Sequence, residues 1–130
     1  MLHRIRALVS MVAMLACGGA YAQGYPSKPI TFIIPFAAGG DSDLSGRNVA
    51  AHAQKYLNNQ PIVSVNRTGA SGTIGAQAVR TAAPDGYTLL VARIATHAIA
   101  PALDSKVPYK WNEFTMLSLI ELNPFICYIK

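Results

Sequence analysis

The sequence has little cysteine and little charge, and its hydrophobic runs are short. Its 130 residues include two cysteines, and 13% are charged although 52% are hydrophobic. It contains no Cys-x-x-Cys motif and no cluster of His, Cys, Asp and Glu with the spacing of a metal site. A chain of this length and composition is typical of one small globular domain. We therefore expect a single domain that binds neither a metal ion nor a cofactor.

The first 22 residues have the pattern of a secretory signal peptide. Arg4 and Arg6 precede an apolar run from Ala7 to Cys17, and the small-x-small sequence AYA occupies positions 20–22. The run is well below the ~20 residues that a membrane-spanning helix requires. We expect residues 1–22 to be removed and residues 23–130 to form the exported, periplasmic domain. One alternative stays open, because AMLAC at 13–17 is similar to a lipoprotein box that would place a lipid on Cys17.

The charged side chains of the mature segment are scattered rather than clustered. Removal of residues 1–22 takes away Arg4, Arg6 and Cys17. The mature segment then has nine basic and six acidic side chains, a net charge of +3, and one cysteine, Cys127. Nucleic-acid binding is disfavoured, because it depends on clustered basic side chains. No intrachain disulfide can form with one cysteine, and Cys127 is best interpreted as a small buried apolar residue.

Apolar segments alternate with segments that have helical spacing. The run ITFIIPF (30–36) predicts a strand covered on both faces, as in a parallel sheet. Further strands are expected at 62–65 and 87–93, helices at 44–58 and 73–83, a mixed loop and short helix after 93, and extended segments at 115–122 and 125–130. This alternation predicts an α/β fold with a parallel sheet.

Three loops follow the predicted strands: PFAAGGDSD (35–43), NRTGASG (66–72) and RIATH (93–97). Because the carboxyl ends of parallel strands lie along one edge, we expect these loops to meet at one rim. Glycine-rich loops that lead into helix N-termini can bind anions through backbone amides. The glycines at 69, 72 and 75 match neither the dinucleotide motif nor the P-loop. Two interpretations of them stay open, tight turns and a carboxylate site.

Two polar residues at the start of the first helix have a structural interpretation. Ser42 and Asp43 are expected to form its N-cap, because their side-chain oxygens can accept the first amide protons. Asp41 is expected to be a solvated loop residue. A catalytic or metal-binding pair of carboxylates is disfavoured, because no second cluster completes such a site.

The remaining polar candidates lie at the ends of the second and third strands. Arg67 and Arg93 occupy positions where a guanidinium can pair with a ligand carboxylate, although a solvated arginine is the commoner outcome. His97 is interpreted either as a hydrogen-bond donor at the rim or as a structural residue. A serine hydrolase is disfavoured, because the chain has no G-x-S-x-G motif.

Four segments, read together, carry a family resemblance. They are YPSKPITFIIPFAAGGDSDLSGR, QPIVSVNRTGASGTIGAQAV, APDGYTLLVA and THAIAPAL. From Tyr25 to about Phe125 the chain closely resembles the Bug-type extracytoplasmic solute receptors, the TctC-like periplasmic substrate-binding proteins of tripartite tricarboxylate transporters.

The resemblance implies a two-lobed Venus-flytrap receptor, not an enzyme, that closes on a small carboxylated solute and passes it to the membrane components of the transporter. Such receptors hold the carboxylate through loops of the first lobe, largely by main-chain groups. Carried onto this sequence, the ligand-binding residues are Phe36, Ala37, Ala38, Gly39, Gly40 and Asp43, then Asn66, Gly69, Gly72 and Thr73, and finally Thr96 and His97.

Two of the chain's departures from the family pattern bear on function. Arg93 and Ile94 stand where small residues are usual, so Arg93 is expected either to alter ligand choice or to block the cleft. The chain is also short for a two-lobed receptor, and we expect residues 23–130 to be its N-terminal lobe, with the second lobe missing. The alternatives are a periplasmic enzyme that binds an anionic or phosphorylated substrate through the glycine loops, and a non-functional truncated copy.

N-terminal mass spectrometry of the exported chain tests the interpretation of the first 22 residues. We expect the mature protein to begin at Gln23, because signal peptidase cuts after a small-x-small sequence such as the one that ends at Ala22. A mature chain that begins at an acylated Cys17 would instead establish a lipid anchor.

Overall fold

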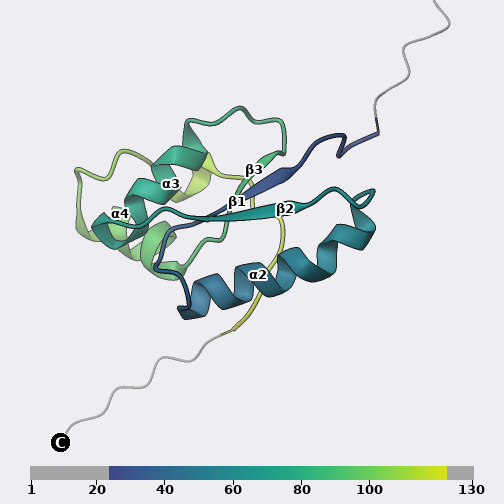
Figure 1. Cartoon of the computed structure of the whole chain (residues 1–130). Coiled ribbons are helices and arrows are strands. Elements are labelled where there is room, and N and C mark those ends of the chain that lie inside the picture. The colour runs from purple at the N-terminus through teal and green to yellow at the C-terminus, as the bar shows by residue number, and fades with distance from the viewer. Residues whose placement is uncertain (1–23, 123–130) are drawn as a thin grey trace, which may run out of the picture.

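The computed structural model describes residues 24–122, which form a parallel three-stranded sheet with helices on both faces (Figure 1). The strands are β1 (Ile30–Ile34), β2 (Ile62–Asn66) and β3 (Thr88–Leu90), in the order β2-β1-β3. The predicted signal peptide and the predicted extended segment at 125–130, with Cys127, lie outside the described residues. Within residues 24–122 no helix has the length and apolar character needed to cross a membrane.

The helices cover both faces of the sheet. α2 (Asp41–Ala53) packs against β1 and β2, whereas α3 (Thr73–Arg80) packs against β1 and β3 (Figure 1). A π-helix (Ala95–Ile99) and the short α4 (Ala100–Leu103) follow β3, and 3₁₀ turns occur at Gln54–Tyr56, Ala70–Gly72 and Trp111–Glu113.

The core lies around the central strand, because β1 is covered from both sides. Ile30, Phe32 and Ile34 point toward one face and are buried with Val91. Ile33 points toward the opposite face and is also buried. The predictions of a parallel strand covered on both faces and of an α/β fold are therefore confirmed, although the strand spans 30–34 rather than 30–36.

Register brings the carboxyl ends of the three strands to one level. Ile34 pairs with Asn66 of β2, and Ile33 pairs with Leu90 of β3. Just beyond the strands, the Arg67 amide donates to the Ile34 carbonyl at 2.8 Å and the Val91 amide donates to the Ile33 carbonyl at 3.0 Å. The loops that follow the strands therefore begin side by side.

The opposite end of the sheet is closed by aromatic and charged side chains. The Tyr25 hydroxyl donates to the Gly86 carbonyl at 2.7 Å, and the Tyr25 and Tyr87 ring centroids are 5.1 Å apart. Lys28 lies 4.2 Å from the centroid of Tyr87 and pairs with Asp85 at 3.3 Å. These contacts tie the chain before β1 to the turn before β3.

Several predicted boundaries differ from the structure. The first helix begins at residue 41 rather than 44, and the third strand covers 88–90 rather than 87–93. The predicted extended segment at 115–122 belongs to no strand of the sheet. Its apolar side chains are not buried, and the larger ones are 43–81% exposed: Met116, Leu117, Leu119, Ile120 and Leu122.

Candidate ligand-binding site

The three loops meet at Gly72, as the strand topology predicts. A Cβ atom on Gly72 would lie 2.2 Å from the Thr96 methyl group, 3.1 Å from Cβ of Pro35 and 3.3 Å from the Phe36 ring. The backbone of Gly72 is also left-handed, with φ +88°. Because only glycine combines this conformation with such close neighbours, the loop after β2 can sit between the loops after β1 and β3.

Gly75 has a second structural reason to lack a side chain. A Cβ there would lie 2.8 Å from the Arg67 carbonyl oxygen and 2.9 Å from Cβ of Pro35. The first turn of α3 therefore packs directly on the ends of β1 and β2. The spacing of glycines at 72 and 75 is accounted for by turn geometry and close packing, so it does not by itself indicate a ligand.

Asp43 organises the loop after β1. Its buried carboxylate accepts hydrogen bonds from Nε of Arg47 and from the Gly39 amide, both at 2.9 Å, and from Nδ2 of Asn66 at 2.8 Å. Asn66 also donates to the Phe36 carbonyl at 3.0 Å. The Arg47 hydrogen bond, followed by those from Gly39 and Asn66, lowers the pKa of Asp43 to about 2.

The prediction that Ser42 and Asp43 cap the first helix is wrong. α2 begins at Asp41 and its N-cap is Gly40, which offers no side chain. Asp43 lies inside the first turn, where its charge favours the positive end of the helix, and its oxygens reach back to the loop instead. Asp41 is the first helical residue rather than a solvated loop residue, and it pairs with Arg93.

The amides of the tandem glycines are engaged within the loop. The Gly39 amide donates to Asp43, and the Gly40 amide donates to the Ala37 carbonyl at 3.3 Å. Ala37 and Ala38 are exposed at the tip. The loop is therefore shaped by its own hydrogen bonds, and it presents the start of α2 rather than free glycine amides.

Two helix N-termini lie at this rim. The first amide groups of a helix have no intrahelical acceptor and carry the positive end of the helix dipole; in α2 these groups include the amides of Ser42 and Asp43. α3 begins at Thr73, directly after Gly72, and the Thr73 hydroxyl donates to the Ala70 carbonyl at 2.9 Å. Chemically, this arrangement suits an anion.

Thr96 and His97 lie in the π-helix and are buried. Thr96 donates from Oγ1 to the Arg93 carbonyl at 2.9 Å, and its own carbonyl accepts the Tyr109 hydroxyl at 2.7 Å. His97 packs edge-on against Phe114 with ring centroids 4.5 Å apart. Neither ring nitrogen of His97 has a hydrogen-bond partner among residues 24–122. Burial lowers the pKa of His97.

Arg93 has partners that the sequence did not indicate. Its Nε donates to the Ser42 hydroxyl at 2.7 Å, its Nη2 pairs with Asp41, and its Nη1 pairs with Glu121 at 2.6 Å. Arg67, the other candidate, is exposed. No periodicity or motif pointed to Glu121, because it lies in a segment that was expected to be a strand.

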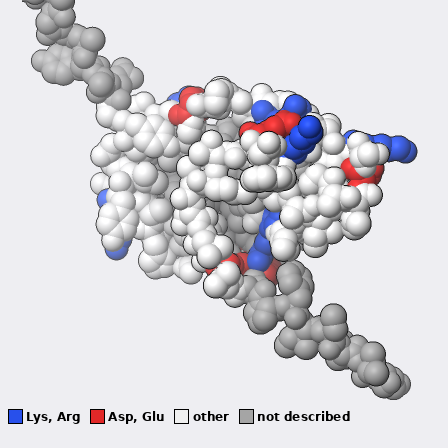
Figure 2. Space-filling model, turned by 180° about the vertical axis from the view of Figure 1, so that it is seen from behind, with Lys and Arg blue, Asp and Glu red and all other residues white. Residues whose placement is uncertain are grey.

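Charged groups are spread over this lobe. On the face shown in Figure 2 most of the surface is uncharged, and several of the basic groups lie next to acidic ones. Across residues 24–122 no group of three or more His, Cys, Asp and Glu side chains could hold a metal ion. A hollow of about 280 Å³ lies away from the rim, between α2 and β2, where it is lined by Arg47, Ala50, Ala51, Gln54, Pro61, Ile62 and Ser64.

Comparison with solved structures identifies the lobe as that of a periplasmic binding protein. A periplasmic transporter is 45% identical, with a TM-score of 0.64 over 67% of this chain and 29% of that chain. MatC from Rhodopseudomonas palustris, solved with bound malate, is 41% identical, with a TM-score of 0.64 over 68% of this chain and 30% of its own.

Sequence comparison names the family. The profile of the tripartite tricarboxylate transporter family receptor matches residues 46–130. BugT from Bordetella pertussis is 43% identical over 90 residues, which cover 68% of this chain and 27% of BugT. A UPF0065 protein of Bordetella bronchiseptica is 40% identical over 108 residues, 83% of this chain and 32% of its own. The chain belongs to this receptor family, as the resemblance implied, and it spans about a third of the length of these relatives.

The role of the Asp43 network can be measured through pH. Because the folded pKa of Asp43 is about 2 and its ordinary value is 3.8, its carboxylate stabilises the fold above pH 3.8, and this contribution is lost as the pH falls toward 2. We expect Asp43→Asn to lower the melting temperature at pH 7 and to flatten its decline between pH 4 and 2. Asp104→Asn, which changes an exposed carboxylate, is the control. Parallel melting curves for wild type and Asp43→Asn would contradict this role.

His97 predicts a second pH dependence of stability. A buried histidine whose pKa is lowered is neutral when folded, whereas the unfolded chain takes up a proton near the ordinary value of 6.5. Stability is therefore complete above pH 6.5 and falls as the pH drops below it. We expect urea midpoints of the wild type to decline between pH 7.5 and 5.5, and His97→Leu to remove that decline. The exposed His52 provides the control, as His52→Gln should behave like the wild type. A decline that survives in His97→Leu would refute the assignment.

Proposed function

We propose that this chain is the glycine-loop lobe of a periplasmic solute receptor that captures a small carboxylate and delivers it to a tripartite tricarboxylate transporter. In this proposal residues 1–22 direct export and residues 23–130 form the lobe. The single observation that carries it is that α2 and α3 both begin in loops at one rim, where Gly72, the residue before α3, packs against the loops after β1 and β3, in a chain of this receptor family.

The chemistry of the rim supports a carboxylate as the ligand. Amides in the first turns of α2 and α3 supply donors and the positive ends of two dipoles, without any need for a metal ion. The relative MatC was solved with malate, a small dicarboxylate, and it matches 68% of this chain. The Phe36 ring and the Thr96 methyl group, which border Gly72, add apolar contacts beside it.

Binding is better supported than catalysis at this site. Asp43 has a pKa of about 2 and is committed to Arg47 and Asn66, so it is a poor general base at neutral pH. His97 is buried and packs on Phe114. A group that transfers protons to a substrate must reach it, and neither side chain is presented to solvent at the rim.

Substitution of Gly40 tests the proposed cradle. Gly40 is extended, with φ −77° and ψ 169°, a conformation that valine adopts readily, although its Cβ would lie 3.2 Å from the Ala37 carbonyl oxygen. We expect Gly40→Val to keep the circular dichroism spectrum but to weaken malate binding at least about tenfold, because a branched side chain would cover the start of α2. Amide shifts in an NMR titration with malate measure the affinity even when it is weak.

Gly24→Val provides the matched control. Gly24 is exposed, and the nearest neighbour of an added Cβ is Nδ2 of Asn58 at 3.9 Å, beyond the C-terminal end of α2. This variant should bind malate like the wild type. Wild-type affinity in Gly40→Val would show that this loop is not the cradle, and a wild-type chain whose rim amides do not respond to any carboxylate would overturn the proposed function.

A further inference from the structure

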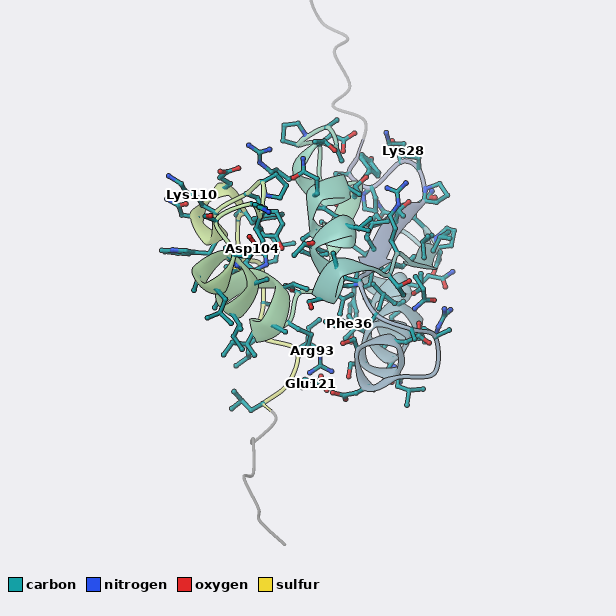
Figure 3. All side chains as sticks on the ribbon, turned by 90° about the vertical axis from the view of Figure 1, so that its left-hand side faces the viewer. Lys28, Phe36, Arg93, Asp104, Lys110 and Glu121 are labelled. Carbon is teal, nitrogen blue, oxygen red and sulfur yellow. The ribbon has the colours of Figure 1, made fainter. Side chains whose placement is uncertain are left out.

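The guanidinium of Arg93 reaches the first turn of α2. Arg93 lies in the loop after β3, and its side chain is 19% exposed. Figure 3 places it between Phe36 and Glu121. Its Nε bond to the Ser42 hydroxyl, at 2.7 Å, fixes it beside a first-turn residue of α2. A solute whose first carboxylate is held by the helix starts would therefore have Arg93 within reach of a second anionic group.

The three nitrogen atoms of the Arg93 guanidinium contact partners that the fold holds with different firmness. Ser42 is buried within α2, and Asp41 is the first residue of the same helix. Glu121, which pairs with Nη1 at 2.6 Å, comes from residues 115–122, a segment without helix or strand. Its link to the helix is the Ser45 hydroxyl, which donates to it at 2.6 Å.

Glu121 is the exchangeable partner of Arg93. Asp41 and Ser42 belong to α2, whereas Glu121 reaches Nη1 of Arg93 from a segment without helix or strand. The neighbours of Glu121, Ile120 and Leu122, are 43% and 81% exposed and hold its segment weakly. Another carboxylate that arrives at Nη1 would make the same charge-assisted hydrogen bond that Glu121 makes.

We propose that Nη1 of Arg93 is a selectivity contact for a second anionic group of the solute, and that Glu121 occupies this contact in the unliganded protein. The inference rests on the proposed function, which assigns the first carboxylate to the helix starts. With this contact, the receptor prefers short dicarboxylates to monocarboxylates of the same size. Glu121 acts as an internal competitor that a dicarboxylate displaces.

Succinate and succinamate form a matched pair of probes, because they differ in one carboxylate that is replaced by an amide. NMR titrations of the full chain should show the wild type binding succinate more tightly. We expect Arg93→Gln to weaken succinate binding about tenfold, the loss of one charge-assisted hydrogen bond, and to leave succinamate unchanged. Glu121→Gln should tighten succinate binding about threefold without affecting succinamate, because it removes the competing charge but keeps the shape.

Arg67→Gln is the control, since Arg67 also follows a strand at this rim but is exposed. It should keep the wild-type preference for succinate, which separates a specific contact from general attraction by positive charge.

Two outcomes would overturn the selectivity contact while leaving the proposed function intact. One is a ratio of succinate affinity to succinamate affinity that is the same in wild type and Arg93→Gln, and the other is a loss of succinate affinity in Glu121→Gln. If neither probe shifts any rim amide of the wild type, both the proposed function and this inference are wrong. Glu121→Gln keeps the test decisive even if Arg93→Gln fails to fold, because it leaves Arg93 and α2 unchanged.

Discussion

The close approach of Gly72 to Thr96 holds the rim together. The loop after β2 passes between Pro35 and Thr96, and no side chain fits at the crossing. α3 begins one residue later, so its start is fixed by the same contact. Thr96 is in turn held by a hydrogen bond that the Tyr109 hydroxyl donates to the Thr96 carbonyl. Because protein interiors are close-packed, this crossing leaves the helix starts little freedom to move relative to the strand ends.

A second constraint is electrostatic. Asp43 is satisfied by Arg47, Asn66 and the Gly39 amide, while Asp41 and Glu121 share Arg93. A buried charge is costly unless it is paired, so the partners of the buried Asp43 help to keep the rim folded at neutral pH. For the proposed recognition of an anion, the acidic side chains near the loops already have basic partners, and the helix starts supply further positive potential.

The sequence predicted those parts of the fold that depend on local pattern and topology. The apolar run at 30–34 gave the central strand, and strand order placed three loops at one rim. The position of the helix start was wrong by a few residues, because Asp43 bonds backward to Gly39 and not as a cap. The ion pair between Arg93 and Glu121 joins residues that no sequence pattern connects. His97 is likewise packed against Phe114, a residue that lies well beyond it in the sequence. Contacts of this kind are set by tertiary packing, which a local pattern does not contain.

The division between fold and selectivity follows from where each kind of residue sits. Backbone amides at a helix start can donate hydrogen bonds to any carboxylate, so a site made from them discriminates poorly among solutes. A guanidinium is directional and adds its preference at one point. Arg93 lies in the loop just after β3 and contacts Ser42 at the rim. It is not part of the core cluster, which consists of Ile30, Phe32, Ile34 and Val91. In the proposal made above, selectivity is therefore separate from the core: a change at Arg93 alters which solute is preferred and removes no residue of the core cluster.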